Sequence, residues 1–190
     1  MIITIDIGNS TIGFGFIKDG HVERVSKIEN EPKSELVRAK LQNFMESVAE
    51  RYKIEKVIIC SVVPAALKKL RVQIKKNWGV TPLVIGKDLK IPIENKYRKP
   101  RQVGKDRLLC AFAALELYGI PAVVIDLGTA ITFDGISVKG EYLGGAIIPG
   151  LRLSAEALFE KTALLPRVRI EEPKKVIGRS TEESIQSGIF

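Results

Sequence analysis

Residues 2–11, IITIDIGNST, decide the fold of this chain. The first six predict a short, buried, mostly β-branched strand with one acid, Asp6, near its end. Gly8 then lets a ligand come close to the backbone, and the amide and hydroxyl side chains of residues 9–11 follow. A carboxylate before such a turn is typical of a site for a metal-bound phosphate.

The same construction returns at residues 123–129, VVIDLGT, where Asp126 stands 120 positions after Asp6. An internal repeat of this kind predicts two units of one type. We therefore predict one domain at 1–118, with the first phosphate turn, and a second at 119–190. The glycines that follow each turn also correspond in spacing: Gly15, Gly20, Gly135 and Gly140.

Hydrophobic periodicity predicts the elements of the first unit. Strands are expected at 12–17 and 22–28, a helix at 32–52, a strand at 56–63, a helix at 65–78 and a short strand at 82–85. The order β-β-β-α-β-α-β is that of a ribonuclease-H-like unit, which forms each half of the actin-like (ASKHA) sugar kinases. We therefore predict an α/β fold of two ribonuclease-H-like units with mixed sheets.

The second unit is expected to be incomplete. A helix that opens near residue 104 precedes predicted strands at 122–126, 130–136 and 141–148 and a helix that ends near residue 160. The repeat then runs out. Residues 175–177 are strand-like and residues 181–189 are helical in pattern, which is less than the first unit contains.

Composition and charge narrow the classes of function. Hydrophobic residues make up 45% of 190, but no apolar run approaches the roughly 18 residues of a membrane span. Since no signal-peptide pattern begins the chain, we expect a soluble cytoplasmic protein without a membrane partner. The net charge is +8, yet basic residues are mixed with acids, so we do not expect a nucleic-acid partner.

Cysteine and histidine chemistry is not indicated. Cys60 and Cys110 lie too far apart for a CxxC motif, and we expect both as reduced core residues. The single histidine, His21, stands beside a predicted turn. Nucleophilic catalysis that depends on histidine is therefore not expected.

A third acid, Asp106, opens a helix after a long basic connection at residues 87–103, and loops of this length often carry function. Its carboxylate could take a proton from an alcohol, or could be an ordinary acid of a first helical turn. Asp6 and Asp126 also have two interpretations. They could hold magnesium or another cation on a polyphosphate, or could belong to simple Asp-x-Gly turns.

Six motifs, in order, resemble those of the type III pantothenate kinases. They are DIGNS (6–10), CSVVP (60–64), GKDR (104–107), DLGTA (126–130), GGAIIPGL (144–151) and SIQSG (184–188). The resemblance spans almost the whole chain. It implies an enzyme that phosphorylates pantothenate with ATP, the first step of coenzyme A biosynthesis, on an actin-like fold that forms a homodimer.

The resemblance also implies roles for single residues. Those that match ATP-binding positions are Asp6, Ile7, Gly8, Asn9, Ser10, Thr11, Ile12, Gly13 and Thr129. Those that match pantothenate-binding positions are Tyr97, Gly104, Lys105, Asp106, Arg107 and Thr181. Asp106 matches the catalytic base and Asp126 a ligand of a monovalent cation, K⁺ or NH₄⁺, while Asp6 is the candidate ligand of Mg²⁺. Arg107 could meet the pantothenate carboxylate through two hydrogen bonds, although a surface arginine would look the same in sequence.

Two departures from the family pattern leave other functions open. The family's chains continue well beyond Gly188, and Lys105 stands where a smaller residue is expected. One alternative is therefore a catalytically impaired protein that binds or regulates, similar to accessory transcription factors. A second is a nuclease on a ribonuclease-H-like fold, but that chemistry needs several acids in one domain, whereas Asp6 and Asp126 lie in separate repeats.

Overall fold

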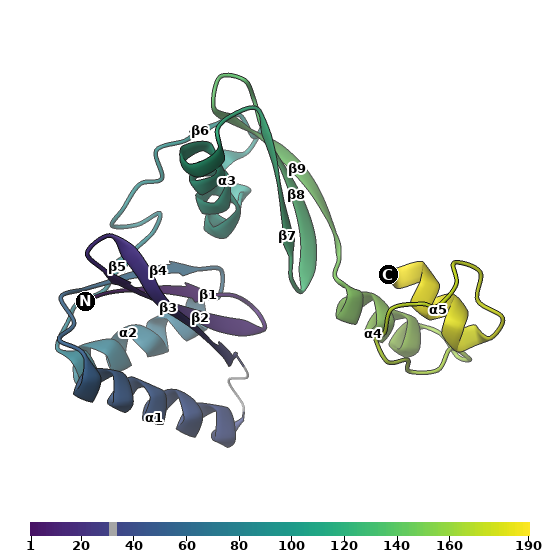
Figure 1. Cartoon of the computed structure of the whole chain (residues 1–190), viewed down its shortest axis with the longest axis horizontal. Coiled ribbons are helices and arrows are strands. Elements are labelled where there is room, and N and C mark those ends of the chain that lie inside the picture. Colours follow the sequence, from purple (N-terminus) through teal and green to yellow (C-terminus); the bar gives the residue numbers. More distant parts are fainter. Residues whose placement is uncertain (31–33) are drawn as a thin grey trace.

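The computed structural model describes residues 1–30 and 34–190 (Figure 1). The start of the helix predicted at 32–52 lies partly outside the described residues. The first sheet has the strand order β3-β2-β1-β4-β5, with β1 (Ile2–Ile7) in the centre. Its other strands are β2 (Thr11–Lys18), β3 (His21–Glu29), β4 (Lys56–Ser61) and β5 (Leu83–Val84).

Buried side chains alternate with more exposed ones along β1, and the buried ones show which face of this sheet packs into the core. Ile3, Ile5 and Ile7 are buried and pack with Phe14, Phe16, Val57 and Ile59 of the neighbouring strands. Helices α1 (Glu35–Arg51) and α2 (Pro64–Trp78) cover this face, as Figure 1 shows. Burying one such side chain stabilises the fold by about 1.5–3 kcal/mol.

The opposite face of the first sheet carries small and polar side chains at the end of β1 that bears Asp6. Asp6 pairs across the ladder with Gly13 of β2 and with Cys60 of β4, so these three residues lie on one face. Helix α3 (Lys105–Tyr118) approaches β4 from this side. The acid of the first repeat therefore faces the second unit, away from the hydrophobic core.

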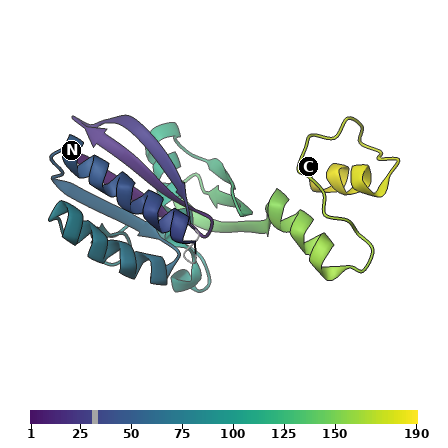
Figure 2. The ribbon, with the colours of Figure 1, turned by 90° about the horizontal axis from the view of Figure 1, so that it is seen from below.

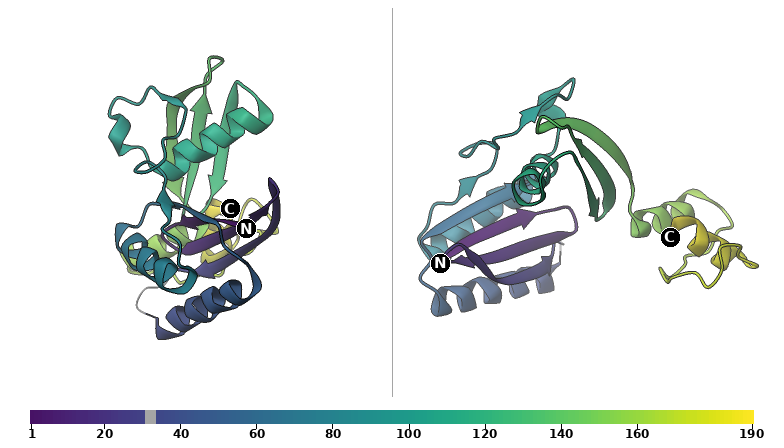
Figure 3. Two further views of the ribbon diagram at one scale, coloured as in Figure 1. Left: turned by 90° about the vertical axis from the view of Figure 1, so that its left-hand side faces the viewer. Right: turned by 45° about the horizontal axis from the view of Figure 1, so that its top comes forward.

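The second sheet has the order β6-β9-β8-β7 and lies on the other side of α3 (Figure 3). Its strands are β6 (Glu94–Asn95), β7 (Ala122–Leu127), β8 (Ala130–Ile136) and β9 (Glu141–Pro149). Strand β6 pairs parallel with β9, whereas the other pairs are antiparallel, so the sheet is mixed. The long basic connection at residues 87–103 thus contributes β6 and a 3₁₀ turn, Pro100–Gln102.

Helices α4 (Leu151–Lys161) and α5 (Thr181–Ile189) stand apart from both sheets at the end of β9 (Figure 2). They pack on one another through a small apolar cluster built on Ala155, Val168 and Ile185. The strand expected at 175–177 is wrong, because those residues form bends and loop. Val176 and Ile177 are exposed there and pair with no strand among the described residues.

The predicted α/β class with two mixed sheets is confirmed. In the first sheet, β4 and β5 continue the sheet on the side of β1 that is away from β2. In the second sheet, β7, which corresponds to β1, is the edge strand. The second unit is therefore smaller than the first within the described residues. The domain boundary after residue 118 stays a prediction. No helix in the described ranges is long and apolar enough to cross a membrane.

Candidate functional site

The two phosphate turns predicted from the repeat meet in space. The hydroxyl groups of Ser10 and Thr129 are hydrogen-bonded at 2.7 Å, although the residues come from different sheets. The glycine of each turn donates back into its own hairpin: Gly8 N–H donates to Thr11 O, three residues on, at 2.9 Å, and Gly128 N–H donates to Ala130 O, two residues on, at 3.2 Å. The structure therefore brings the ATP-binding candidates of both repeats to one place (Figure 1).

Residues outside the predicted turns hold them in position. Asn30 donates from its side chain to Gly8 O at 2.7 Å and from its backbone to Ser10 O at 2.8 Å. Gly150 N–H donates to Thr129 O at 2.9 Å, and a Cβ atom at position 150 would overlap the carbonyl oxygen of Gly128. Asn30 was not predicted, because an asparagine after a strand has no distinctive pattern.

Three carboxylates gather beside the turns. Asp6 and Asp126 lie at the ends of β1 and β7, on the sheet faces toward α3, and Asp106 lies in the first turn of α3. The pKa of Asp6 is raised, first by partial burial of its carboxyl group and then by the negative charges of Asp106 and Asp126, while Lys27 opposes the shift. Asp106 and Asp126 are therefore both close enough for their charges to act on Asp6.

This crowding of negative charge fits a cation, which would relieve the repulsion, and carboxylate oxygens suit both Mg²⁺ and K⁺. However, no three acidic, cysteine or histidine side chains among the described residues are arranged to hold a metal ion unaided. A cation at this place would need further oxygen ligands. The phosphates of a nucleotide carry such oxygens.

The carboxylate of Asp106 is fixed by the start of α3. Its Oδ1 accepts a hydrogen bond from Arg107 N–H at 2.9 Å, whereas its Oδ2 accepts none from the described residues. Gly104 precedes it as the N-terminal cap of α3, and a Cβ atom there would overlap Oδ1 of Asp106. The glycine of the GKDR motif is therefore needed for the position of the acid.

Arg107 has a partner that the sequence did not indicate. Its Nε and Nη2 atoms donate to the carboxylate of Asp134 on β8 at 2.5–3.1 Å. Tyr142 of β9 donates to the same carboxylate at 2.6 Å. Asp134 was missed because an aspartate within a strand usually faces solvent, and its partner is 27 residues away in sequence.

Tyr97 lies at the other end of this group. Its ring centroid is 6.5 Å from that of Tyr142, and its ring packs over Gly144, whose φ is +112°. The side chain of Lys105 lies against Gly86, in the turn that follows β5. The structure thus joins Tyr97 and Arg107 through Tyr142 and Asp134, but gives Lys105 a packing contact in the first unit.

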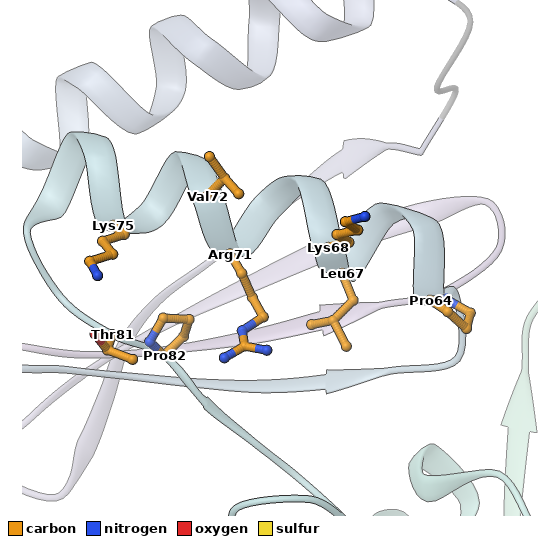
Figure 4. Close-up of a pocket in the computed structure, with 8 residues that line it drawn as sticks. All are labelled: Pro64, Leu67, Lys68, Arg71, Val72, Lys75, Thr81 and Pro82. Carbon is orange, nitrogen blue, oxygen red and sulfur yellow. The ribbon is translucent and has the colours of Figure 1, made fainter.

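The structure does not bring the predicted residue Thr181 to this place. It is exposed at the start of α5, which packs on α4 away from the sheets (Figure 2). A shallow hollow of about 440 Å³, between α2 and the residues 81–82 that lead into β5, is also separate from the acids (Figure 4). It is lined by basic and apolar side chains and no carboxylate: Pro64, Leu67, Lys68, Arg71, Val72, Lys75, Thr81 and Pro82.

Known proteins share both the sequence and the fold. Residues 2–190 match the sequence profile of the type III pantothenate kinases. The chain is 48% identical over 198 residues to a type III pantothenate kinase of Persephonella marina, covering 100% of this chain and 76% of that protein. It is 41% identical over 192 residues to one of Finegoldia magna, covering 100% and 73%.

A solved structure agrees in fold. It is that of a conserved Campylobacter jejuni protein assigned to the Baf family of transcriptional activators, with a TM-score of 0.56 and 21% identity over 98% of this chain and 73% of that one. At that identity the likeness concerns the fold alone. The match over residues 2–190 and the two relatives, in contrast, identify the family. The chain belongs to the type III pantothenate kinase family.

Proposed function

We propose that this protein transfers the terminal phosphoryl group of ATP to the primary hydroxyl group of pantothenate, giving 4'-phosphopantothenate for coenzyme A biosynthesis. The observation that carries the proposal is the meeting of the two phosphate turns at Ser10 and Thr129, with Asp6, Asp106 and Asp126 around them. A phosphoryl transfer needs donors for phosphate oxygens, carboxylates for a cation and one acid for the alcohol. These groups are all present here.

The first turn, residues 6–13, and Thr129 would bind the nucleotide. Backbone N–H groups and the hydroxyls of Ser10 and Thr129 can replace their mutual hydrogen bond with bonds to phosphate oxygens. Asp6 would hold Mg²⁺ and Asp126 the monovalent cation, K⁺ or NH₄⁺. Such cations neutralise charge on the phosphates during transfer.

Asp106 would act as the base. Its Oδ1 is engaged by the backbone of Arg107, so Oδ2 can orient the pantothenate hydroxyl and take its proton as the phosphoryl group transfers. The adjacent Arg107 would bind the pantothenate carboxylate. Tyr97 packs at the far end of the same group and would contact the rest of the substrate.

Thr181 and the expected homodimer belong together in this proposal. Helix α5 holds Thr181 apart from Asp106 within one chain, so a second copy would have to supply this contact. An exposed apolar face on the second sheet gives a second copy a surface to bind. Cytoplasmic location stays a prediction.

The test is the transfer of phosphate from ATP to pantothenate with Mg²⁺ and K⁺ present, measured for the wild type and for Asp106→Asn. We expect the substitution to lower kcat by about 100-fold or more, the usual range for loss of a general base. Asp19→Asn is the matched control, because Asp19 is an exposed acid in the β2–β3 turn and should leave kcat unchanged. Equal rates for wild type and Asp106→Asn would remove Asp106 as the base, and no transfer by the wild type would remove the kinase function.

A further inference from the structure

Asp134 is the one charged side chain that is fully buried among the described residues, with 1% of the residue's surface exposed. Four donor groups from three side chains compensate for that burial by donating hydrogen bonds to the Asp134 carboxylate. Arg107 donates from Nε at 3.0 and 3.1 Å and from Nη2 at 2.5 Å, Tyr142 from its hydroxyl at 2.6 Å, and Thr132 from its hydroxyl at 3.3 Å. A buried carboxylate with this many donors has a single stable orientation.

The pairing decides which part of Arg107 is available to a ligand. A guanidinium can donate two parallel hydrogen bonds along the Nε–Nη2 edge or along the Nη1–Nη2 edge. Asp134 occupies the first edge, so the second edge, with Nη1 and the remaining hydrogen of Nη2, is left for another acceptor. That second edge has the geometry to bind a carboxylate with two bonds.

The strand register of the second sheet places the Arg107–Asp134 pair on the same face as the proposed base, Asp106. Asp134 and Asp126 both point to the face of the sheet that α3 covers, since they alternate with outward-facing residues on paired strands. Arg107 follows Asp106 directly in α3. A ligand carboxylate on the free edge of Arg107 would therefore leave the rest of the ligand near Asp106.

We propose that Asp134 is a positioning residue that presents the Nη1–Nη2 edge of Arg107 to the carboxylate of the substrate, and so makes the enzyme selective for an acid over a neutral analogue. This inference depends on the proposed function, because it concerns the same substrate. Tyr142 and Thr132 support it by holding the Asp134 carboxylate in place.

A buried ion pair could instead serve only to attach α3 to the second sheet. That role predicts lower thermal stability for an Asp134 variant with unchanged selectivity. Positioning predicts a different result, because the loss would fall on the binding of the carboxylate. The two are separated by comparing pantothenate with its neutral alcohol analogue, pantothenol, in which a hydroxymethyl group replaces the carboxylate.

The variant to measure is Asp134→Asn, which keeps the size of the side chain but offers Arg107 one acceptor oxygen and an opposing amide. We expect the KM for pantothenate to rise about tenfold with kcat within about twofold, and the kcat/KM for pantothenol to change by less than about twofold. The preference for the acid should thus fall about tenfold. An unchanged or increased preference would overturn the inference.

A double-mutant cycle shows whether Asp134 acts through Arg107. In an Arg107→Lys background, which removes both edges but keeps the charge, Asp134→Asn should have little further effect on the KM for pantothenate. Independent, additive effects would contradict positioning. Tyr142→Phe should also raise the KM for pantothenate, by about threefold. This variant still tests the inference if Asp134→Asn fails to fold.

Glu55→Gln is the matched control. It also removes a carboxylate from an ion pair, here with the N-terminal amine at 2.9 Å, but this pair lies at the start of β4 in the first sheet and does not include Arg107. Direct calorimetry of pantothenate binding separates this inference from the proposed function. If the wild type binds pantothenate without phosphorylating it, the proposed function fails, but Asp134→Asn should still bind pantothenate more weakly than the wild type. If the wild type neither binds nor phosphorylates pantothenate, both the proposed function and this inference are overturned.

Discussion

Asp6 and Cys60 are opposite residues on neighbouring parallel strands, so the negative charge of Asp6 affects the pKa of the Cys60 thiol. Burial raises the pKa of the Cys60 thiol from 9.0 to about 12, and the negative charge of Asp6 is the next cause. Asp6→Asn should therefore lower this pKa while leaving it above 9, because burial remains. Thiolate absorbance during a pH titration, in a Cys110→Ser background, measures the shift.

The same titration has a consequence for stability. Because the folded-state pKa of Cys60 exceeds that of the unfolded chain, its contribution to the free energy of unfolding is complete below about pH 9 and is lost as the pH rises toward 12. Asp6→Asn should lower the upper limit of this pH range, because it lowers the folded-state pKa of Cys60. An identical titration in both proteins would show that Asp6 and Cys60 do not interact.

Single residues also show how much of the site could be predicted. Asp6 and Asp126 were predictable because the repeat marks them twice, and Asp106 because a motif surrounds it. Asp134 was not, since its role depends on Arg107 and Tyr142, which only the pairing of β8 with β9 and the packing of α3 bring together. Local patterns indicate strand ends and helix starts, but not contacts between distant segments.

At the scale of elements, hydrophobic periodicity predicted the first unit well, because its central strands β1 and β4 and its two helices are long enough to show a buried face in the sequence. The errors fall on short segments. Strand β6 has two residues and exists only because β9 pairs with it, so its own sequence contains no signal. The apolar residues at 176–177 predicted a strand, but no neighbouring strand is present in the described residues to pair with them.

Strands β8 and β9 lie so close at Gly145 that no side chain fits there. A Cβ atom at this position would overlap the carbonyl oxygen of Phe133 and lie 3.0 Å from Oδ1 of Asp134. Gly145→Ala should therefore push the strands apart and lower the free energy of unfolding by about 3 kcal/mol. Urea denaturation followed by circular dichroism measures this loss.

Gly188→Ala is the control for this substitution, because it adds the same methyl group where nothing lies within 4 Å. Gly188 is in α5, where alanine is the better helix former, so this variant should be as stable as the wild type or more stable by up to about 1 kcal/mol. Equal stability of Gly145→Ala and the wild type would mean that β8 and β9 are less closely packed than described.

At the scale of the whole molecule, the second sheet is covered on one face only. Helix α3 packs on the face with Asp126 and Asp134, while the other face exposes Val123, Ile125 and Leu127 of β7. Strand β7 is also the edge of the sheet, so its outer backbone groups have no strand partner among the described residues. An open edge beside an apolar face is a typical site of association between chains.

We therefore expect this chain to self-associate through β7, in a manner that depends on concentration and is measurable by sedimentation velocity. Val123→Ser with Ile125→Ser should weaken association at least tenfold, because it removes apolar surface that is 68% and 55% exposed in the single chain. Val22→Ser with Val25→Ser removes equally exposed valines, 63% and 62%, from β3 of the other sheet and should have no effect. A protein that stays monomeric at all concentrations, or that loses association equally in both variants, would show that the second sheet is not the contact surface. Thr181 would then need another route to the substrate.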